Sequence, residues 1–278
     1  MSQLIQLKQR IQAIASIKKI TQTMRLISMS SHSKLKKQSE SLQRFRAEVK
    51  PLLCALTTKN QAPSNELTAK YKNLFIVFAA EKGLCGAFNS SMFTYFNHHL
   101  TPEALDNSHI ICVGKKAIDY LQLRNIEPLL KFDKVLPNKL EKIAQDLYEQ
   151  VVKIHESYES VICLSSHPKT FFVQEAQTTT IIPVQQDPCD LENIVSLDDY
   201  EWVQDQRSVK ACMFAILLKT NILLILTNSM LSEQSARFLS MDSATRSAED
   251  LLKSMKLAFN KLRQAKITRE LIELISGF

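Results

Sequence analysis

Glycine and proline are absent from both ends of this 278-residue chain. Residues 1–50 and residues 189–276 contain neither, whereas all eight prolines and three of the four glycines lie between them. Inside a helix a glycine costs about 1 kcal/mol and a proline about 3 kcal/mol relative to alanine. The distribution therefore predicts two long helices that flank a more compact middle domain.

The first of these ends carries an apolar stripe at helical spacing. Steps of three and four residues connect its members, with one extra three-residue step from Ile14 to Ile17, a slip that overwinds a supercoil locally. A serine-rich interruption, SMSSHS at 28–33, then separates two parts of the stripe. The first part is Leu4, Leu7, Ile11, Ile14, Ile17, Ile20, Met24 and Ile27, and the second is Leu35, Leu42, Phe45, Val49, Leu52 and Leu56.

The second end shows a heptad pattern in which small and large apolar residues alternate. Its members are Ala248, Leu251, Met255, Ala258, Leu262 and Ala265. Each long helix thus has one face that requires a partner helix. We predict that residues 1–56 and 208–278 pair with each other as an antiparallel coiled coil.

Residues 73–184 alternate short apolar runs with helical patterns. The runs at 73–80, 109–114 and 161–167 are rich in β-branched and aromatic residues and predict strands, and 138–158 predicts a helix. This alternation indicates an α/β domain with a mostly parallel sheet. Residues 178–184 predict a last, edge strand, because Pro183 cannot donate to a central ladder.

The net charge of +7 is concentrated at the start of the chain. Residues 1–50 hold eleven Lys and Arg against two Glu, a balance of +9. Such a segment attracts nucleic acid, an anionic membrane surface or an acidic protein ring, and composition does not choose among them. The longest apolar stretch, 211–226, is shorter than the roughly 20 residues of a membrane span and contains Lys219. We expect a buried helical segment there, with no insertion into the membrane.

The motif EKGLCGAFN at 81–89 follows the first predicted strand. Its glycines are spaced GxxG, which is neither of the common nucleotide-binding patterns. We predict a tight structural turn made by Gly83, Cys85, Gly86 and Asn89, whose glycines permit close backbone packing. A catalytic Cys85 is the alternative, but no evident general base accompanies it. We expect no catalytic residue, no metal and no cofactor.

Both ends of the chain, and this turn, resemble the gamma subunit of F-type ATP synthases. The N-terminal similarity lies in LKQRIQAIASIKKITQTMRLIS at 7–28, and the turn GLCGAFN at 83–89 is also similar. The C-terminal similarity covers 232–277 and is the more specific. It rests on Glu233, Arg237, Met241, Asp242, Ala244, Thr245, Asn260, Arg263, Gln264, Ala265, Ile267, Thr268, Glu270, Glu273, Ser276 and Gly277.

The resemblance implies a long antiparallel coiled coil of the terminal helices, with a central Rossmann-like α/β domain of mostly parallel strands. It implies a rotor shaft that is not itself catalytic. Such a shaft couples proton- or sodium-driven rotation of the c-ring to ATP synthesis or hydrolysis at the alpha–beta hexamer. The implied partners are the alpha and beta subunits, the epsilon and delta subunits and the c-ring. The implied location is peripheral, on the cytoplasmic face of a bacterial inner membrane or on the matrix side of a mitochondrial one.

The resemblance also implies which residues meet partners. Asp187 and Pro188 would face the c-ring and epsilon. Contacts with alpha and beta would come from Lys19, Met24, Arg237, Arg263, Gln264, Thr268, Glu270 and Glu273.

Two other functions remain open from the residues alone. A basic coiled-coil protein could bind nucleic acid through its first helix, with an affinity that falls steeply as salt rises. An α/β enzyme could be carried on a helical stalk, although the middle domain offers no catalytic constellation.

Overall fold

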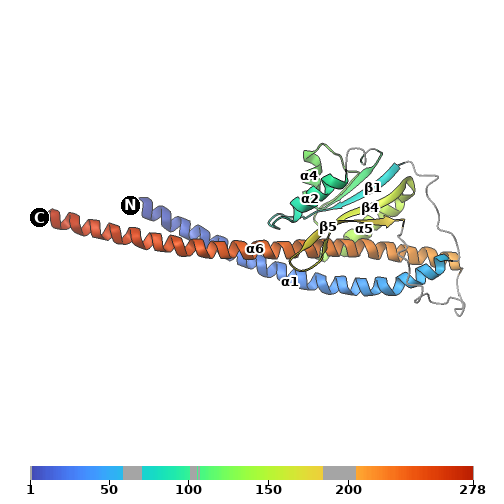
Figure 1. Ribbon diagram of the computed structural model, residues 1–278, viewed down its shortest axis with the longest axis horizontal. Coiled ribbons are helices and arrows are strands. Elements are labelled where there is room, and N and C mark those ends of the chain that lie inside the picture. Colours follow the sequence, from blue (N-terminus) through green and yellow to red (C-terminus); the bar gives the residue numbers. More distant parts are fainter. Residues whose placement is uncertain (1, 59–70, 101–104, 106, 184–204, 278) are drawn as a thin grey trace. The chain divides into compact units, whose positions relative to one another are not determined.

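The structure is a computed structural model that describes residues 2–58, 71–100, 105, 107–183 and 205–277 (Figure 1). Two very long helices, α1 (Ser2–Thr58) and α6 (Gln206–Ser276), flank the shorter elements in the sequence. The strands are β1 (Tyr71–Phe78), β2 (His109–Val113), β3 (Leu130–Phe132), β4 (Tyr158–Pro168) and β5 (Gln174–Ile182). The other helices are α2 (Phe88–His99), α4 (Lys115–Leu123) and α5 (Leu140–Ile154), with single 3-10 turns η2 (Pro137–Lys139) and η3 (His155–Ser157).

The chain forms two compact units. Met1–Ser30 and Arg237–Phe278 make the first, here called the coiled-coil unit, and Ser31–Ala236 make the second, here called the sheet unit. Because α1 and α6 each contribute to both units, the boundary between them falls within continuous helices and not in loops.

The sheet unit contains one five-stranded sheet in the order β3-β2-β1-β4-β5. Strand β1 is central, and its Ile76 lies beside Ile111 of β2 and Cys163 of β4, both in parallel pairing. β5 pairs antiparallel with β4 and forms one edge. The predicted mostly parallel sheet and its last edge strand are therefore confirmed. The sequence did not reveal β3, which has only three residues and no apolar run of its own.

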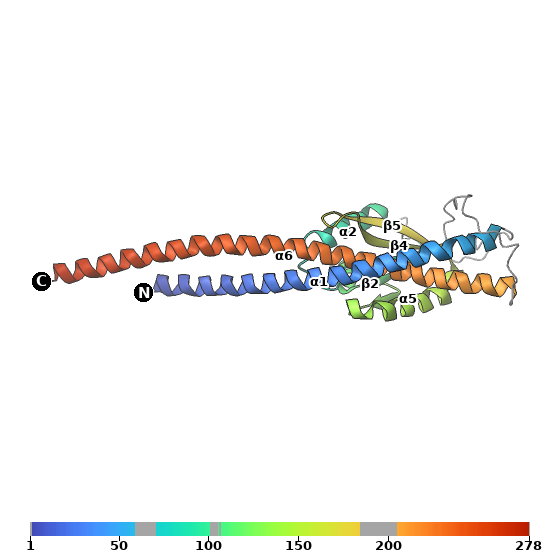
Figure 2. The same cartoon turned by 90° about the horizontal axis from the view of Figure 1, so that it is seen from below.

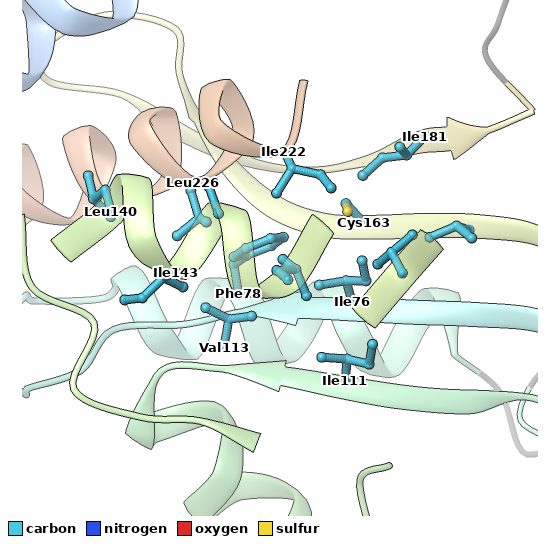
Figure 3. Close-up of a cluster of buried hydrophobic side chains, with 14 of the residues drawn as sticks. Ile76, Phe78, Ile111, Val113, Leu140, Ile143, Cys163, Ile181, Ile222 and Leu226 are labelled. Carbon is cyan, nitrogen blue, oxygen red and sulfur yellow. The ribbon is translucent and has the colours of Figure 1, made fainter. Parts of the chain in front are cut away.

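Both faces of the sheet are covered by helices. On one face Ile76 and Phe78 of β1 pack in a core with Ile222 and Leu226 of α6 and with α5 (Figure 3). On the other face Phe75 and Val77 pack against α2 and α4. Because successive residues of a strand point to opposite faces, a strand covered on both sides needs an unbroken apolar run. The run LFIVF in β1 meets that need.

The apolar stretch 211–226 lies in the first third of α6. By length and composition alone, α6 could cross a membrane. Within the sheet unit, however, Leu218, Ile222 and Leu226 of this stretch are nearly fully buried in the core shared with the sheet. The stretch is thus the core-facing part of a long helix, as predicted.

In the coiled-coil unit α1 and α6 run antiparallel, as predicted. Lys18 pairs with Glu249, and seven residues further along α1 Arg25 pairs with Asp242, seven residues earlier in α6. Between these two pairs Thr21 lies opposite Thr245, with their hydroxyls 2.8 Å apart. These three contacts fix the register of the two helices.

The slip predicted in the stripe of α1 is absent. The covered positions continue at steps of three and four from Ile14 through Lys18, Thr21, Arg25 and Ser28. Helix α1 and its line of covered residues then continue without a break through the serine-rich segment. His32 of this segment is buried in the sheet unit. The prediction was wrong because it traced the contact line between the two helices, here called the seam, through apolar residues only. In this part of α1 polar residues occupy the seam. Ile17, Ile20 and Ile27 are instead 52%, 58% and 59% exposed.

The heptad pattern predicted for α6 has the correct period. Half of its positions, however, lie one residue before the position that is covered. The apolar residues covered after Ala248 are Leu252, Met255 and Phe259. Leu251, Leu262 and the alanines 258 and 265 are exposed. On the register above, Leu252, Met255 and Phe259 fall opposite Ile14, Ile11 and Leu7. Larger side chains thus fill the seam where the sequence suggested small ones.

Candidate partner interface

One flank of the coiled-coil unit is held by ion pairs. The Lys18 Nζ and Glu249 Oε1 atoms are 2.9 Å apart, and Arg25 Nη1 lies 2.6 Å from Asp242 Oδ1. Arg246 also reaches Asp242, at 2.7 Å. The hydrogen bond from Arg25, helped by the charge of Arg246, lowers the pKa of Asp242 below its ordinary value. The hydrogen bond and charge of Lys18 likewise lower the pKa of Glu249. We call these five residues the ionic flank.

The seam between the two helices is polar where it meets the ionic flank. Thr245 hydrogen-bonds Thr21 and also the backbone oxygen of Met241, so its hydroxyl is satisfied. Ser28 is only 1% exposed, and its hydroxyl has no hydrogen-bond partner among the described residues. A buried polar atom without a partner costs about 1–3 kcal/mol. This part of the coil therefore forgoes some of the stability that an apolar seam would provide.

The opposite flank of the coil is apolar. In α1 the residues that directly precede seam positions include Ile17, Ile20, Met24 and Ile27, and in α6 they include Leu251. Since an antiparallel pair places such residues of both helices on the same side, they form one surface, which also contains Ala244. We call these six residues the apolar flank. Its three isoleucines and Leu251, which is 48% exposed, present more apolar surface than a solvated face normally does.

Three apolar residues of α1 do not follow this division. Ile5, Leu26 and Met29 are exposed and follow seam positions, which places them toward the side of the ionic flank. Sequence reasoning missed the apolar flank because it placed the same isoleucines in the seam. The signal that could have revealed the flank was available. Steps of seven residues from Leu4 lead to Lys18 and Arg25, which places these polar residues in the seam. The apolar residues directly before the seam positions then form a second line beside it.

The last part of α6 is exposed on every side. On the register of the ion pairs Leu4 falls opposite Leu262, so residues beyond about 266 have no partner in α1. The large apolar side chains that this leaves exposed are Ile267, Leu271, Ile272, Leu274 and Ile275. Arg263, Gln264, Thr268, Glu270 and Glu273, which the resemblance assigned to partner contacts, are exposed on the same stretch. Their described bonds are local: Thr268 donates to the backbone oxygen of Gln264, and Glu270 pairs with Lys266.

The remaining residues assigned to partner contacts are placed differently. Lys19 is exposed beside the ionic flank, and Met24 is half-buried on the apolar flank. Arg237 is only 8% exposed, so its side chain lies largely within the chain. Asp187 and Pro188 lie outside the described residues.

The turn at 81–89 is held together by its own side chains. Asn89 accepts a hydrogen bond from the backbone N–H of Ala80 and donates one to the sulfur of Cys85. Gly86 has a φ of 55°, in the left-handed region that favours glycine. At Gly83, by contrast, an added Cβ would meet no atom within 4 Å, so the close packing expected of this glycine is not found. Cys85 is 2% exposed, which does not suit a nucleophile.

The described residues contain no cluster of three or more His, Cys, Asp or Glu that could hold a metal ion. Charge gathers instead on the coiled-coil unit. Residues 1–30 and 237–278 hold thirteen Lys and Arg against five Asp and Glu, a net +8, which leaves the rest of the chain at −1. The arrangement suits binding to an acidic macromolecule through apolar contacts as well as charge.

Comparison with known proteins gives a consistent result. The family described as ATP synthase matches residues 3–278. The ATP synthase gamma chain of Methylobacterium sp. (strain 4-46) is 32% identical over 299 aligned residues, which cover 100% of this chain and 99% of that one. The gamma chain of Clostridium beijerinckii is 29% identical, covering 99% of this chain and 96% of the relative.

Solved structures show the same fold. The rotor of the Euglena gracilis mitochondrial ATP synthase matches with a TM-score of 0.69 at 15% identity, covering 96% of this chain and 99% of that one. A chain from the OSCP/F1/c-ring structure of the same enzyme also matches with a TM-score of 0.69, covering 99% of this chain and 93% of that one.

Proposed function

The chain belongs to the ATP synthase gamma-chain family, and from this premise we propose that it is the central rotor shaft of an F-type ATP synthase. In this role it performs no chemistry. It rotates with the c-ring and, through its asymmetry, drives the catalytic sites of the alpha–beta hexamer through their states in turn. The match over residues 3–278 is the observation that carries the proposal.

The proposed partners follow from the family and from the solved complexes. The Euglena structures are named for a rotor and for an OSCP/F1/c-ring assembly. For this chain we propose contacts with alpha and beta along the coiled-coil unit, and with epsilon, delta and the c-ring elsewhere. The complex would sit peripherally, on the cytoplasmic face of a bacterial inner membrane or on the matrix side of a mitochondrial one.

We assign the contacts with alpha and beta to two surfaces of the coiled-coil unit. The first is the apolar flank, because its exposed isoleucines gain most from being covered. The second is the exposed end of α6, with Arg263, Gln264, Thr268, Glu270 and Glu273. The unit's charge of +8 would give a diffuse attraction to an acidic ring without fixing one orientation. Lys19 would add to it from the ionic side.

The nucleic-acid alternative has lost its support. The basic charge of residues 1–50 suggested it, but the family match covers residues 3–278 and so includes nearly all of that segment. The enzyme alternative is weakened by the buried Cys85 in the turn.

Co-expression with the alpha and beta subunits of the same organism tests the proposal. We expect a stable complex that hydrolyses ATP, and rotation of this chain within it when it carries a fluorescent probe. A chain that stays monomeric beside a properly formed alpha–beta ring would contradict it. A steep, salt-dependent affinity for DNA without any such complex would restore the nucleic-acid alternative.

A further inference from the structure

The carboxyl ends of parallel strands are where α/β sheets usually hold ligands, and helix N-termini there usually hold anions. In the sheet unit this place is occupied by the chain's own Glu81. The residue follows β1 by three positions, and its carboxylate oxygen Oε2 accepts two backbone hydrogen bonds. One comes from the N–H of Lys115, at 3.2 Å, and the other from the N–H of Val135, at 3.3 Å.

These two N–H groups belong to different segments of the chain. Lys115 is the first residue of α4, directly after β2, and Val135 lies in the segment after β3. The residue before α4 is Gly114, which provides no side-chain cap for the helix. One oxygen of Glu81 thus joins the ends of three neighbouring strands and supplies an acceptor for the first N–H of α4, for which Gly114 has no side chain.

The backbone around Glu81 is drawn in tightly. Gly114 has a φ of 99°, and a Cβ at this position would lie 2.1 Å from the backbone oxygen of Ala79. Only glycine permits this approach. The N–H of Lys116 also donates to the backbone oxygen of Ala80 at 3.1 Å. The approach brings the end of β1 against the start of α4, which is what lets Glu81 reach its donors.

A small cavity lies at the same edge of the sheet. The cavity lined by Phe78, Val113, Val135 and Glu233, among others, has about 10 Å³ of space, enough for about one water molecule. That cavity is too small for a molecule of metabolite size. A separate apolar cluster contains Ala80, Cys85, Phe88 and Ala236 of α6.

We propose that Glu81 is a built-in anion. Its carboxylate takes the place that a bound phosphate or carboxylate has in a ligand-binding sheet, and it fastens the segments after β1, β2 and β3 together. The sheet unit thereby keeps the architecture of a ligand-binding domain while needing no ligand. The inference concerns the sheet unit alone, and holds whether or not the chain turns within an ATP synthase.

The test is to remove the carboxylate and supply an anion from solution. In the full chain, Glu81→Ala should lower the midpoint of thermal unfolding by roughly 3–6 °C. Inorganic phosphate, titrated at constant ionic strength, should recover part of this loss with a saturable dependence. The control is Glu127→Ala, an exposed glutamate in a loop of the same unit, which should unfold like the wild type and gain nothing specific from phosphate.

Hydrogen exchange supplies a readout that a general loss of stability would not reproduce. In Glu81→Ala the amides of Lys115 and Val135 should exchange faster than their neighbours, and phosphate should protect these two amides again. An unfolding midpoint equal to that of Glu127→Ala would overturn the proposal. So would a phosphate response no larger than that of the control.

If Glu81→Ala does not fold, Glu81→Gln keeps the proposal testable. The amide retains one acceptor oxygen and loses the charge. We then expect weaker protection of the Lys115 and Val135 amides than in the wild type, with no phosphate response because the place remains filled. Unchanged protection of both amides would contradict a role for the charge of Glu81.

Discussion

The two units treat large apolar side chains in opposite ways. The sheet unit buries them, with Ile76, Leu147 and Ile222 inaccessible between the sheet and its helices. The coiled-coil unit displays them. Among the described residues, fourteen of the 23 large exposed apolar side chains lie in this unit, which has only 72 residues.

The contrast separates residues that stabilise the folded chain from exposed residues that are available to bind other proteins. A fold normally places its apolar residues in its own seam, yet the seam of the coil takes Lys18, Thr21, Arg25 and Ser28 while isoleucines face outward. Polar residues in the seam lower the stability of the free chain, and isoleucines outside it increase the apolar area that can contact a partner in a complex. The sheet unit thus buries most of its large apolar residues, and under the proposed function the exposed ones of the coil are available for assembly.

The largest test of this contrast is a pair of matched truncations. Ile76→Ala in the sheet core should lower the free energy of unfolding by about 3 kcal/mol, because it leaves a cavity among buried side chains. Ile20→Ala on the apolar flank should change it by less than about 0.5 kcal/mol. Urea unfolding followed by near-ultraviolet circular dichroism measures both. Equal losses would mean that Ile20 is packed within the free chain.

For binding to the alpha–beta ring we expect the opposite order, with substitutions on the apolar flank having a larger effect than substitutions in the sheet unit. The double substitution Ile20→Asn, Ile27→Asn should weaken binding to the alpha–beta ring about tenfold, since two isoleucines no longer lose water-exposed surface. The free chain should unfold as before. Titration of the labelled chain against the ring measures the affinity. Leu123→Asn, at an 84% exposed position of the sheet unit, is the control and should bind the ring normally. A normal affinity of the double variant would remove the apolar flank from the interface.

Two buried serines distinguish the units at a finer scale. Ser28 in the coil finds no hydrogen-bond partner within the part of the chain that the structure describes, whereas Ser39 in the sheet unit donates to Asn228 at 2.7 Å. Ser28→Ala should therefore raise the free energy of unfolding by about 1 kcal/mol, and Ser39→Ala should lower it by about 1 kcal/mol. Parallel denaturant titrations give both values. The contrast fails if Ser28→Ala is the more destabilising of the two.

The smallest effect is the pH dependence that the ion pairs give to the coil. The pKa values of Asp242 and Glu249 are lowered by their pairs with Arg25 and Lys18, so the folded state binds protons less readily than the unfolded one. The stabilisation is present above the ordinary values of these groups and is lost as the pH falls below about 4. Helix melting between pH 7 and pH 3 should show it.

The control for this effect is a third ion pair of the same helix. Replacing Arg25 and Lys18 by methionine should remove most of the pH dependence of helix melting. Lys253→Met should leave it intact, because Lys253 and Asp250 form an exposed pair whose atoms lie 3.6 Å apart. An equal effect of both changes would show that the dependence comes from the net charge of the coil and not from these pairs.

The sequence predicted the fold through features that depend on burial or on breakers. The absence of glycine and proline indicated the long helices, and β1 was visible because it is apolar on both faces. β3 was not visible, because three edge residues bury too little to leave a pattern. The coil was predicted with the right partners and orientation but with the wrong seam. Periodicity alone assigns all apolar residues of a helix to one interface. It does not distinguish the seam of α1 from a second apolar surface, the apolar flank.

The candidate interface was harder to predict for the same reason. Arg263 and Gln264 were assigned to partner contacts through family resemblance. Whether they meet a partner remains a prediction. The role of Glu81 could not be inferred at all, because its two donors, Lys115 and Val135, lie 34 and 54 residues away in the sequence. Only the folded sheet brings them to one carboxylate.

The continuity of α6 has a mechanical consequence. At 1.5 Å per residue its 71 residues make a helix with a contour of about 105 Å, without glycine or proline to interrupt its hydrogen bonds (Figure 2). A twist applied along α6 would therefore meet no residue at which this helix is prone to bend, and it would spread as a small angular strain over many turns.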